Sequence, residues 1–431
     1  MLKITTHLKD SLRYGIARNS RKLGIIVVCN IAIQAVSLLG FIFIVRLYQE
    51  SQVGEYVTFL AYVGIFTILS TGFYEQALFL EKRAAYVKLL KLIPLGLAVI
   101  ASILVGIGLY LAHIPYAPYI VVSVISGGIS ITASNICILQ NKLVFSSTYR
   151  LITAPLIPGG IIAVGMLAET SGEAMVAVSS ISSMVLALHF YSLVNPYKGI
   201  RFDSGVKRQL VISLALIRRY RKFFFYGMFG ELIGSAAYRM PVIQINSYFG
   251  AANSAYFGIA MRILITPVSL LIGTVSQMFL LKVSENKKSG IPSLQVTLKL
   301  LALLSILGGV SFLFCAVLAE PIIVILFGDK YAMVGETLFW LSPFLFSLIA
   351  ISPLTQVLTV YEKQEYAFYN KITQFILSVG SFFLGYMFNS YILGVQALSL
   401  SITLLYIVIL GQIFNVLLRY DRAYKKQFRN N

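Results

Sequence analysis

Residues 223–281 read FFFYGMFGELIGSAAYRMPVIQINSYFGAANSAYFGIAMRILITPVSLLIGTVSQMFLL. They contain two apolar stretches long enough to cross a bilayer, joined by a short turn at residues 250–253. Glu231, Arg239 and Arg262 lie within these stretches. An ionised side chain at such a depth costs several kcal/mol unless it faces protein or water. These three residues are therefore the first candidates for a functional site.

The composition of the whole chain has the same apolar character. Of its 431 residues, 58% are hydrophobic and only 12% are charged, and the mean hydropathy is +0.84. A soluble domain would not carry so much apolar sequence, nor about a dozen runs of bilayer-spanning length. The composition predicts an all-α polytopic membrane protein with about 12 transmembrane helices.

The apolar runs divide into two halves of six spans. The first half is expected at residues 23–194 and the second at 223–418, with a basic arm at 1–22, a basic linker at 195–222 and a basic tail at 419–431. The expected spans are residues 23–45, 53–80, 89–112, 117–140, 151–168, 174–194, 223–249, 253–281, 294–319, 335–360, 368–388 and 391–418.

Lys and Arg are distributed very unevenly between the two sides of this predicted bundle. With the N-terminus inside, 31 of the 35 fall in cytoplasmic segments, Arg46 and Lys330 fall outside, and Arg239 and Arg262 lie within spans. Because positive residues concentrate on the cytoplasmic side of membrane proteins, both termini are expected in the cytoplasm. The same rule accounts for the net charge of +19 without nucleic acid as a partner.

The linker at residues 195–222 carries eight Lys or Arg. Its short apolar stretch at 210–217 is preceded by Lys207 and Arg208 and followed by the basic run at 218–222. Such a stretch is too short to span, but as a basic amphipathic helix it would lie in the headgroup region and meet anionic lipids. A cluster of charge that only fixes the topology is the alternative.

The two halves carry a trace of duplication. Residues 46–56 and 246–256 each straddle the external turn between the first two spans of a half, and each carries two tyrosines at the same spacing. Because six spans per half is an even number, both halves have the same orientation. This is the parallel-repeat arrangement of transporters that rock about a central site.

Glu231 and Arg262 are expected at similar depths in neighbouring spans. Glu231 lies roughly 13 Å from the cytoplasmic start of its span, and Arg262 roughly 14 Å from the external start of the next. In a hydrocarbon core about 30 Å thick, the two side chains can pair. One interpretation is a structural ion pair. The other is that Glu231 orients Arg262 or binds a coupling ion.

Arg239 has no acidic residue at its depth. Pro241, just beyond it, is expected to kink the helix and free a carbonyl group. This combination favours a wet cavity with an anionic ligand, and a guanidinium group suits phosphate or pyrophosphate. Tyr238 offers a sugar-stacking ring with a hydroxyl group, although tyrosines near span ends are also typical interfacial anchors.

Glu75 is the candidate that the first half contributes. It lies in a polar break at residues 71–76, near the inner end of the second span. There it would either face the same cavity or end a helix in the headgroup zone.

The sequence shows no pattern typical of nucleotide binding, acid–base catalysis or metal binding. The chain has no GxxxxGK[ST] phosphate loop and no paired carboxylates suited to acid–base catalysis. Its three cysteines and three histidines have no metal-binding spacing. Neither an enzyme, nor a cofactor, nor a metal site is expected.

Several segments resemble one family of transporters. They are the turn at residues 46–56, its counterpart at 248–258 with Arg262 and Pro267 following, and EPIIVILFGDKY at 320–331. Together with the twelve-span plan, these segments are similar to the polysaccharide-transport branch of the multidrug/oligosaccharidyl-lipid/polysaccharide exporter superfamily.

The resemblance implies two six-helix lobes that form a V around a central cavity. It implies a bacterial inner-membrane flippase that moves undecaprenyl-pyrophosphate-linked oligosaccharide repeat units, for O-antigen, capsule or exopolysaccharide, to the periplasmic leaflet by alternating access. Membrane lipids and other polysaccharide-assembly proteins are its expected partners. Arg239 and Arg262 are the residues that would bind the lipid-linked phosphate.

Two other functions stay open. A cation-coupled multidrug antiporter would depend on membrane carboxylates, of which the first-half spans have only Glu55 and Glu75 near their ends. A membrane glycan polymerase, which is an enzyme, would be expected to carry charged groups on a sizeable external loop. The external loops of this chain are short.

Overall fold

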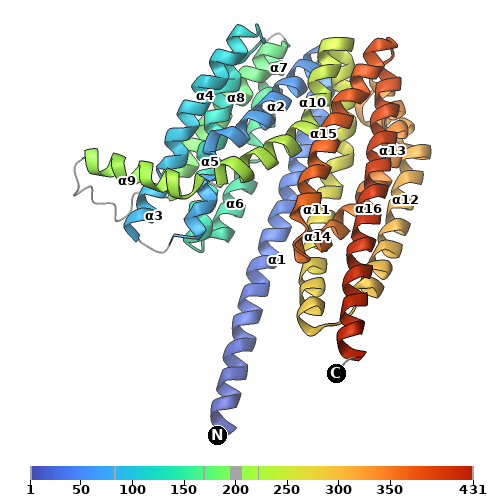
Figure 1. Ribbon diagram of the computed structural model, residues 1–431. Coiled ribbons are helices and arrows are strands. Elements are labelled where there is room, and N and C mark those ends of the chain that lie inside the picture. The colour runs from blue at the N-terminus through green and yellow to red at the C-terminus, as the bar shows by residue number, and fades with distance from the viewer. Residues whose placement is uncertain (1, 82–83, 168–169, 195–205, 222, 430–431) are drawn as a thin grey trace. The chain divides into compact units, whose positions relative to one another are not determined.

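The computed structural model describes residues 2–81, 84–167, 170–194, 206–221 and 223–429, and the secondary structure in these ranges is all helical (Figure 1). This confirms the all-α fold. The helices in chain order are α1 (Leu2–Leu47), α2 (Glu50–Thr71), η1 (Tyr74–Phe79), α3 (Ala84–Leu90), α4 (Ile93–Leu111), α5 (Ala117–Leu139), α6 (Leu143–Thr153), α7 (Leu156–Leu167), α8 (Gly172–Val194), α9 (Val206–Arg219), η2 (Phe223–Met228), α10 (Phe229–Phe249), α11 (Ala251–Ser289), α12 (Leu294–Phe327), η3 (Asp329–Tyr331), α13 (Ala332–Ile351), η4 (Ser352–Thr355), α14 (Gln356–Val360), α15 (Gln364–Met387) and α16 (Tyr391–Arg429).

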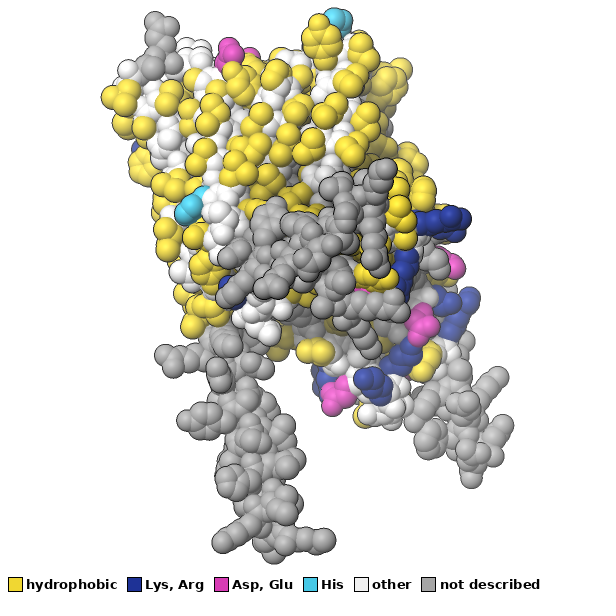
Figure 2. Space-filling model, turned by 90° about the vertical axis from the view of Figure 1, so that its left-hand side faces the viewer, with side chains coloured by type: hydrophobic (Ala, Val, Ile, Leu, Met, Phe, Trp, Pro, Cys, Tyr) yellow, Lys and Arg dark blue, Asp and Glu magenta, His cyan; other side chains and the backbone are white. Residues whose placement is uncertain are grey.

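Ten helical segments of the described chain are long and apolar enough to cross a membrane. The two remaining expected spans, 223–249 and 368–388, correspond to α10 and α15. At 21 and 24 residues these helices are long enough to cross, but they carry more polar side chains than the others. Apolar side chains cover most of the described surface in Figure 2, as expected of helices that meet lipid.

The expected second span, residues 53–80, is broken in the structure. α2 ends at Thr71 because Gly72 and Phe73 adopt left-handed backbone conformations, with φ of 56° and 64°. Glycine adopts this conformation freely, whereas a residue with a Cβ atom does so at a cost of about 1 kcal/mol. The chain continues as the short 3₁₀ helix η1, which carries Glu75.

Contacts divide the chain into two compact units, and α1 and α2 each pass from one unit into the other. Unit 1 consists of Met1–Ile44, Phe66–Glu169 and Glu173–Met228. Unit 2 consists of Val45–Ile65, Thr170–Gly172 and Phe229–Asn431. The predicted lobes at 23–194 and 223–418, and a V-shaped cavity between them, stay predictions.

The core of unit 2 is a closed ring of five helices. α10 packs against α11, α11 against α13, α13 against α16, α16 against α15, and α15 back against α10, while α12 packs on the outside of α13. The two most polar spans, α10 and α15, are therefore neighbours in this ring. Their polar side chains can reach one another instead of meeting lipid.

In unit 1, α4 packs along α5, and α5 is joined to α8 by two pairs of hydroxyl groups. The pairs are Ser123 with Ser180 and Ser126 with Ser183, each at 3.0 Å. α9 packs against α3 and lies across the direction of α4 and α5 (Figure 1). At 14 residues it is too short to span a bilayer.

Candidate functional site

Glu231 of α10 forms an ion pair with Lys371 of α15, with 2.8 Å between Oε1 and Nζ. Both side chains are partly exposed, at 52% and 38%. The structure thus pairs Glu231 with Lys371 rather than with Arg262. The count of Lys and Arg includes Lys371 among the cytoplasmic residues, although it falls within the expected span 368–388; in the structure it lies seven residues after the start of α15 at Gln364.

Arg239 projects from another side of α10, toward α2. Its Nε donates a hydrogen bond to Ser235 Oγ at 3.2 Å, and Ser235 Oγ donates to the Gly64 carbonyl oxygen at 3.3 Å. The guanidinium group lies directly against Gly64, where a Cβ atom would overlap it. Within the described ranges no carboxylate pairs with Arg239, and its side chain is exposed.

Arg262 of α11 also lies beside α2. It is partly buried and close enough to Tyr56 to interact with it electrostatically. Tyr56 and Gly64 are eight residues apart on α2, a rise of roughly 12 Å. The structure therefore places both predicted arginines along one helix, at different heights.

Tyr238 points elsewhere, into a pocket enclosed by the ring of unit 2. Its ring lies on this pocket wall, and its hydroxyl group interacts with that of the buried Tyr406 on α16. The empty space is about 260 Å³ including the open mouth. The wall is formed by Ala237, Tyr238, Pro241, Phe257, Met261, Phe344, Gln374, Ser378, Leu398 and Ile402.

Glu75, the fifth predicted site residue, belongs to unit 1. It is only 3% exposed, and its Oε2 atom has no hydrogen-bond partner among the described residues. η1 lies beyond the last residue of the span that α2 forms. Burial raises the pKa of the Glu75 carboxyl, and a hydrogen bond with the Thr71 side chain offsets part of this rise.

A second polar cluster lies where α1 meets α2, at the predicted external end. Arg46 donates to the carbonyl oxygens of Leu326 and Ile325 at 2.6 and 2.7 Å. In return, Lys330 donates to the carbonyl oxygen of Tyr48 at 2.9 Å. We call these reciprocal contacts the Arg46–Lys330 clasp. The sequence indicated them only indirectly, because these two cations depart from the cytoplasmic distribution of the rest.

The clasp continues along the interface of α2 with α11. Tyr256 donates a hydrogen bond to Glu50 at 2.8 Å, and the hydroxyl groups of Thr58 and Ser254 lie 2.9 Å apart. The two segments that carry the repeated tyrosine spacing thus contact each other directly within unit 2.

A family model described as "Polysaccharide biosynthesis protein" matches residues 117–335, slightly more than half of the chain. No curated protein matches the sequence.

Several solved structures share the fold over nearly the whole chain. An inward-facing multidrug resistance MATE family transporter of the MOP superfamily is 16% identical, with 93% of this chain and 99% of that chain covered and a TM-score of 0.63. The lipid II flippase MurJ in an inward closed conformation is 14% identical, with 92% and 90% covered and a TM-score of 0.67. A MOP superfamily transporter from Pyrococcus furiosus is 13% identical, with 94% and 95% covered and a TM-score of 0.55.

Proposed function

We propose that the chain, which belongs to the polysaccharide biosynthesis protein family, is a flippase for lipid-linked oligosaccharides in the polysaccharide-transport branch of the multidrug/oligosaccharidyl-lipid/polysaccharide (MOP) exporter superfamily. The proposed substrate is an oligosaccharide repeat unit on undecaprenyl pyrophosphate, moved from the cytoplasmic to the periplasmic leaflet of a bacterial inner membrane. The likeness of its fold to a lipid II flippase supports this proposal.

The observation that carries the proposal is the placement of Arg239 and Arg262 along α2. Arg239 is exposed and, in the described part of the chain, has no carboxylate partner. A cation in a span without a paired anion is stable only where water or an anionic ligand reaches it. A pyrophosphate offers oxygen acceptors that match the guanidinium group, whereas a cationic drug would be repelled.

The neighbours of Arg239 prepare it to bind an anion. Ser235 accepts only the Nε hydrogen, so the terminal N–H groups stay available for phosphate oxygens. Gly64 leaves the space in which the guanidinium group lies. Because Arg262 lies near Tyr56, about two turns of α2 away from Gly64, it would contact a different part of the head group, such as an acidic sugar.

Lys371 adds a third cation, which the sequence did not single out. Its partner Glu231 holds it in place, and both side chains are partly exposed. An arriving anion can therefore replace Glu231 as the partner of Lys371 without either charge becoming buried and unpaired.

Translocation in this proposal involves no covalent step. The head group enters between the halves while the polyprenyl tail stays in lipid, and rocking of the halves exposes the head group on the other side. A substrate shifts such an equilibrium only if it binds the two states with different affinities. The arginines are the residues that would provide this difference for an anion.

The proposal is tested by the leaflet distribution of undecaprenyl-pyrophosphate-linked repeat units in bacterial cells deleted for the protein. We expect full repeat units to accumulate on the cytoplasmic face, and wild type but not Arg239→Ala to clear them. Lys288→Ala, which removes an exposed cation from the end of α11, is the matched control and should clear them. Normal distribution in the deleted cells would refute the flippase proposal.

A cation-coupled multidrug antiporter is the second candidate. It is favoured by the buried Glu75 carboxylate, one oxygen of which has no partner among the described residues. An antiporter of this kind should lose drug export in Glu75→Gln or Glu231→Gln and tolerate Arg239→Ala. The flippase should show the opposite order of effects on clearance of repeat units.

A further inference from the structure

α9 has two apolar faces, although it lies in the cytoplasmic linker and is too short to span. About 100° of rotation per residue places Leu216 and Tyr220 on one side of this segment. Val211 and Leu214 fall on the opposite side. The first side is buried in unit 1, at 2% and 9% exposed, whereas Val211 and Leu214 are 65% and 57% exposed.

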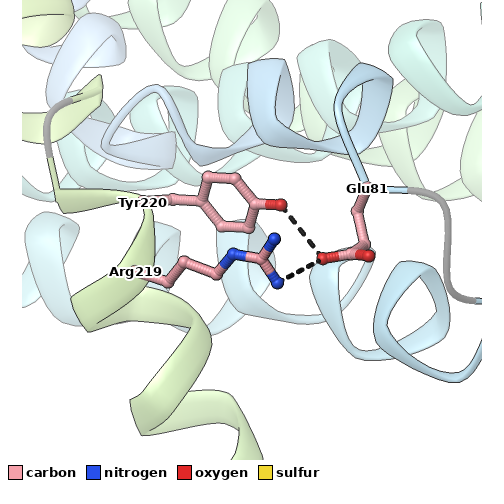
Figure 3. A network of polar contacts seen from close by, with 3 residues as sticks. All are labelled: Glu81, Arg219 and Tyr220. Atoms are coloured by element: carbon pink, nitrogen blue, oxygen red, sulfur yellow. Dashed lines mark hydrogen bonds and ion pairs between the residues drawn. The ribbon is translucent and has the colours of Figure 1, made fainter.

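The inner face is anchored by apolar packing and by a polar network. Leu216 and Tyr220 belong to a buried cluster that includes Leu78 of η1. As Figure 3 shows, Arg219 and the Tyr220 hydroxyl group both point at Glu81, with distances to Oε2 of 3.2 and 3.0 Å. The Glu81 side chain is only 4% exposed. These contacts fix which face of α9 is turned outward.

Two arginines at the C-terminal end of the outer face, Arg218 and Arg221, take no part in the network around Glu81. Val211, Leu214 and Arg218 fall within about 60° of one another around the helix axis, and Arg221 follows just beyond α9. Arg218 and Arg221 are both exposed. Within the ranges described, neither has an ion-pair partner. Over the side chains that the structure describes, the outward surface is therefore apolar at Val211 and Leu214 and cationic at the C-terminal end.

We infer that this outer face is a docking surface for anionic phospholipid. Apolar side chains next to unpaired arginines suit the boundary between acyl chains and negatively charged headgroups. Water would leave Val211 and Leu214 without apolar contact. A zwitterionic bilayer surface would satisfy these two side chains but not the arginines. The inference does not depend on what the protein transports.

The test uses the full chain in vesicles and a single tryptophan. Trp340 is the only native one, so Trp340→Phe with Leu214→Trp reports from α9 alone. Two sets of vesicles contain the same mixture of phosphatidylglycerol and phosphatidylcholine. Phosphatidylglycerol is brominated in one set, and phosphatidylcholine is brominated in the other. We expect stronger quenching by brominated phosphatidylglycerol than by brominated phosphatidylcholine. The preference of α9 for phosphatidylglycerol, calculated from this difference in quenching, should fall about fivefold in Arg218→Gln and about fivefold in Arg221→Gln.

Lys288→Gln with Lys299→Gln is the matched control, because it removes two exposed cations elsewhere and should leave the preference unchanged. Equal quenching by the two brominated lipids would overturn the inference, since α9 would then lie on the membrane without selecting its charge. Absence of quenching by either lipid would also overturn it, because the outer face would then meet water or protein.

Discussion

Gly64 is the residue that lets Arg239 lie against the backbone of α2. A Cβ atom at this position would overlap the guanidinium group, which is the flexible end of its side chain. Gly64→Ala should therefore displace Arg239 while changing the stability of the fold little, because alanine favours a helix over glycine by about 1 kcal/mol. We expect clearance of lipid-linked repeat units to fall toward the level of Arg239→Ala, with the melting temperature unchanged or slightly raised.

Gly273→Ala is the matched control for this substitution. Gly273 lies within α11, and a Cβ atom there would meet nothing within 4 Å. It should preserve clearance. Full clearance by Gly64→Ala would show that the position of the guanidinium group against α2 does not matter for transport.

Lys371 and Glu231 should respond in opposite ways when each charge is removed. Because the pair is partly exposed, either loss should cost no more than about 1 kcal/mol of stability. Lys371→Met removes a cation from the proposed anion path and should lower clearance of repeat units. Glu231→Gln removes the carboxylate that competes with the substrate for Lys371, so it should preserve or raise the clearance of repeat units.

The measurement is the initial rate of clearance after expression of each variant is induced, with protein levels matched. The opposite order, in which Glu231→Gln abolishes transport and Lys371→Met spares it, would favour a carboxylate that couples transport to a cation. The arginine-based proposal would then lose its support.

At the scale of elements, the break after α2 decides the environment of Glu75. Because the helix ends at Gly72 and Phe73, Glu75 enters η1 and is buried. Burial raises its pKa above the ordinary value of 4.5. Below that value the carboxyl is protonated in both the folded and the unfolded chain, so it does not lower the free energy of unfolding. As the pH rises from 4.5 to the raised pKa, the unfolded chain releases this proton while the folded chain keeps it, so stability falls, and above the raised pKa the loss stays constant.

Glu75→Gln should remove this loss. We expect thermal unfolding of the wild type in detergent to shift to lower temperature between weakly acidic and neutral pH, and the shift to be smaller in Glu75→Gln. Glu285→Gln is the control, because Glu285 is exposed and its side chain is paired only at the surface with Lys282. Parallel curves for wild type and Glu75→Gln would contradict the prediction.

Hydropathy was enough to predict the helices, but not the direction in which each side chain points from its helix. Apolar runs predicted the all-α fold because each span must bury its own backbone hydrogen bonds in lipid. Depth alone suggested that Glu231 could pair with Arg262, but the direction around α10 decides the partner, and Glu231 faces Lys371 on α15. Lys371 was overlooked because its charge counted as a loop signal. The sequence indicated a polar break at residues 71–76, but the expected span continued to residue 80 because apolar residues resume at 77–80.

At the scale of the whole molecule, the Arg46–Lys330 clasp explains two exceptions to the charge distribution. Cations are favoured near the carbonyl ends of helices. Arg46 binds carbonyl oxygens in the last turn of α12, and Lys330 binds the carbonyl oxygen of Tyr48 just after α1. The clasp thus joins a turn of the first sequence half to a turn of the second. In an alternating-access transporter, it would hold the predicted external end closed.

Removing the clasp should therefore open that end more often. The native cysteines at 29, 137 and 315 are buried, so a single Thr58→Cys, at a position only 6% exposed, can report on opening through a membrane-impermeant maleimide added outside. If Arg46→Ala with Lys330→Ala removes about 1 kcal/mol that favours closure, the labelling rate should rise about fivefold. Lys288→Ala with Lys299→Ala, a matched loss of two exposed cations, should leave it unchanged. An unchanged rate in the clasp variant would mean that packing of α2 on α11 closes this end without the two cations, which would then serve only to cap the helices.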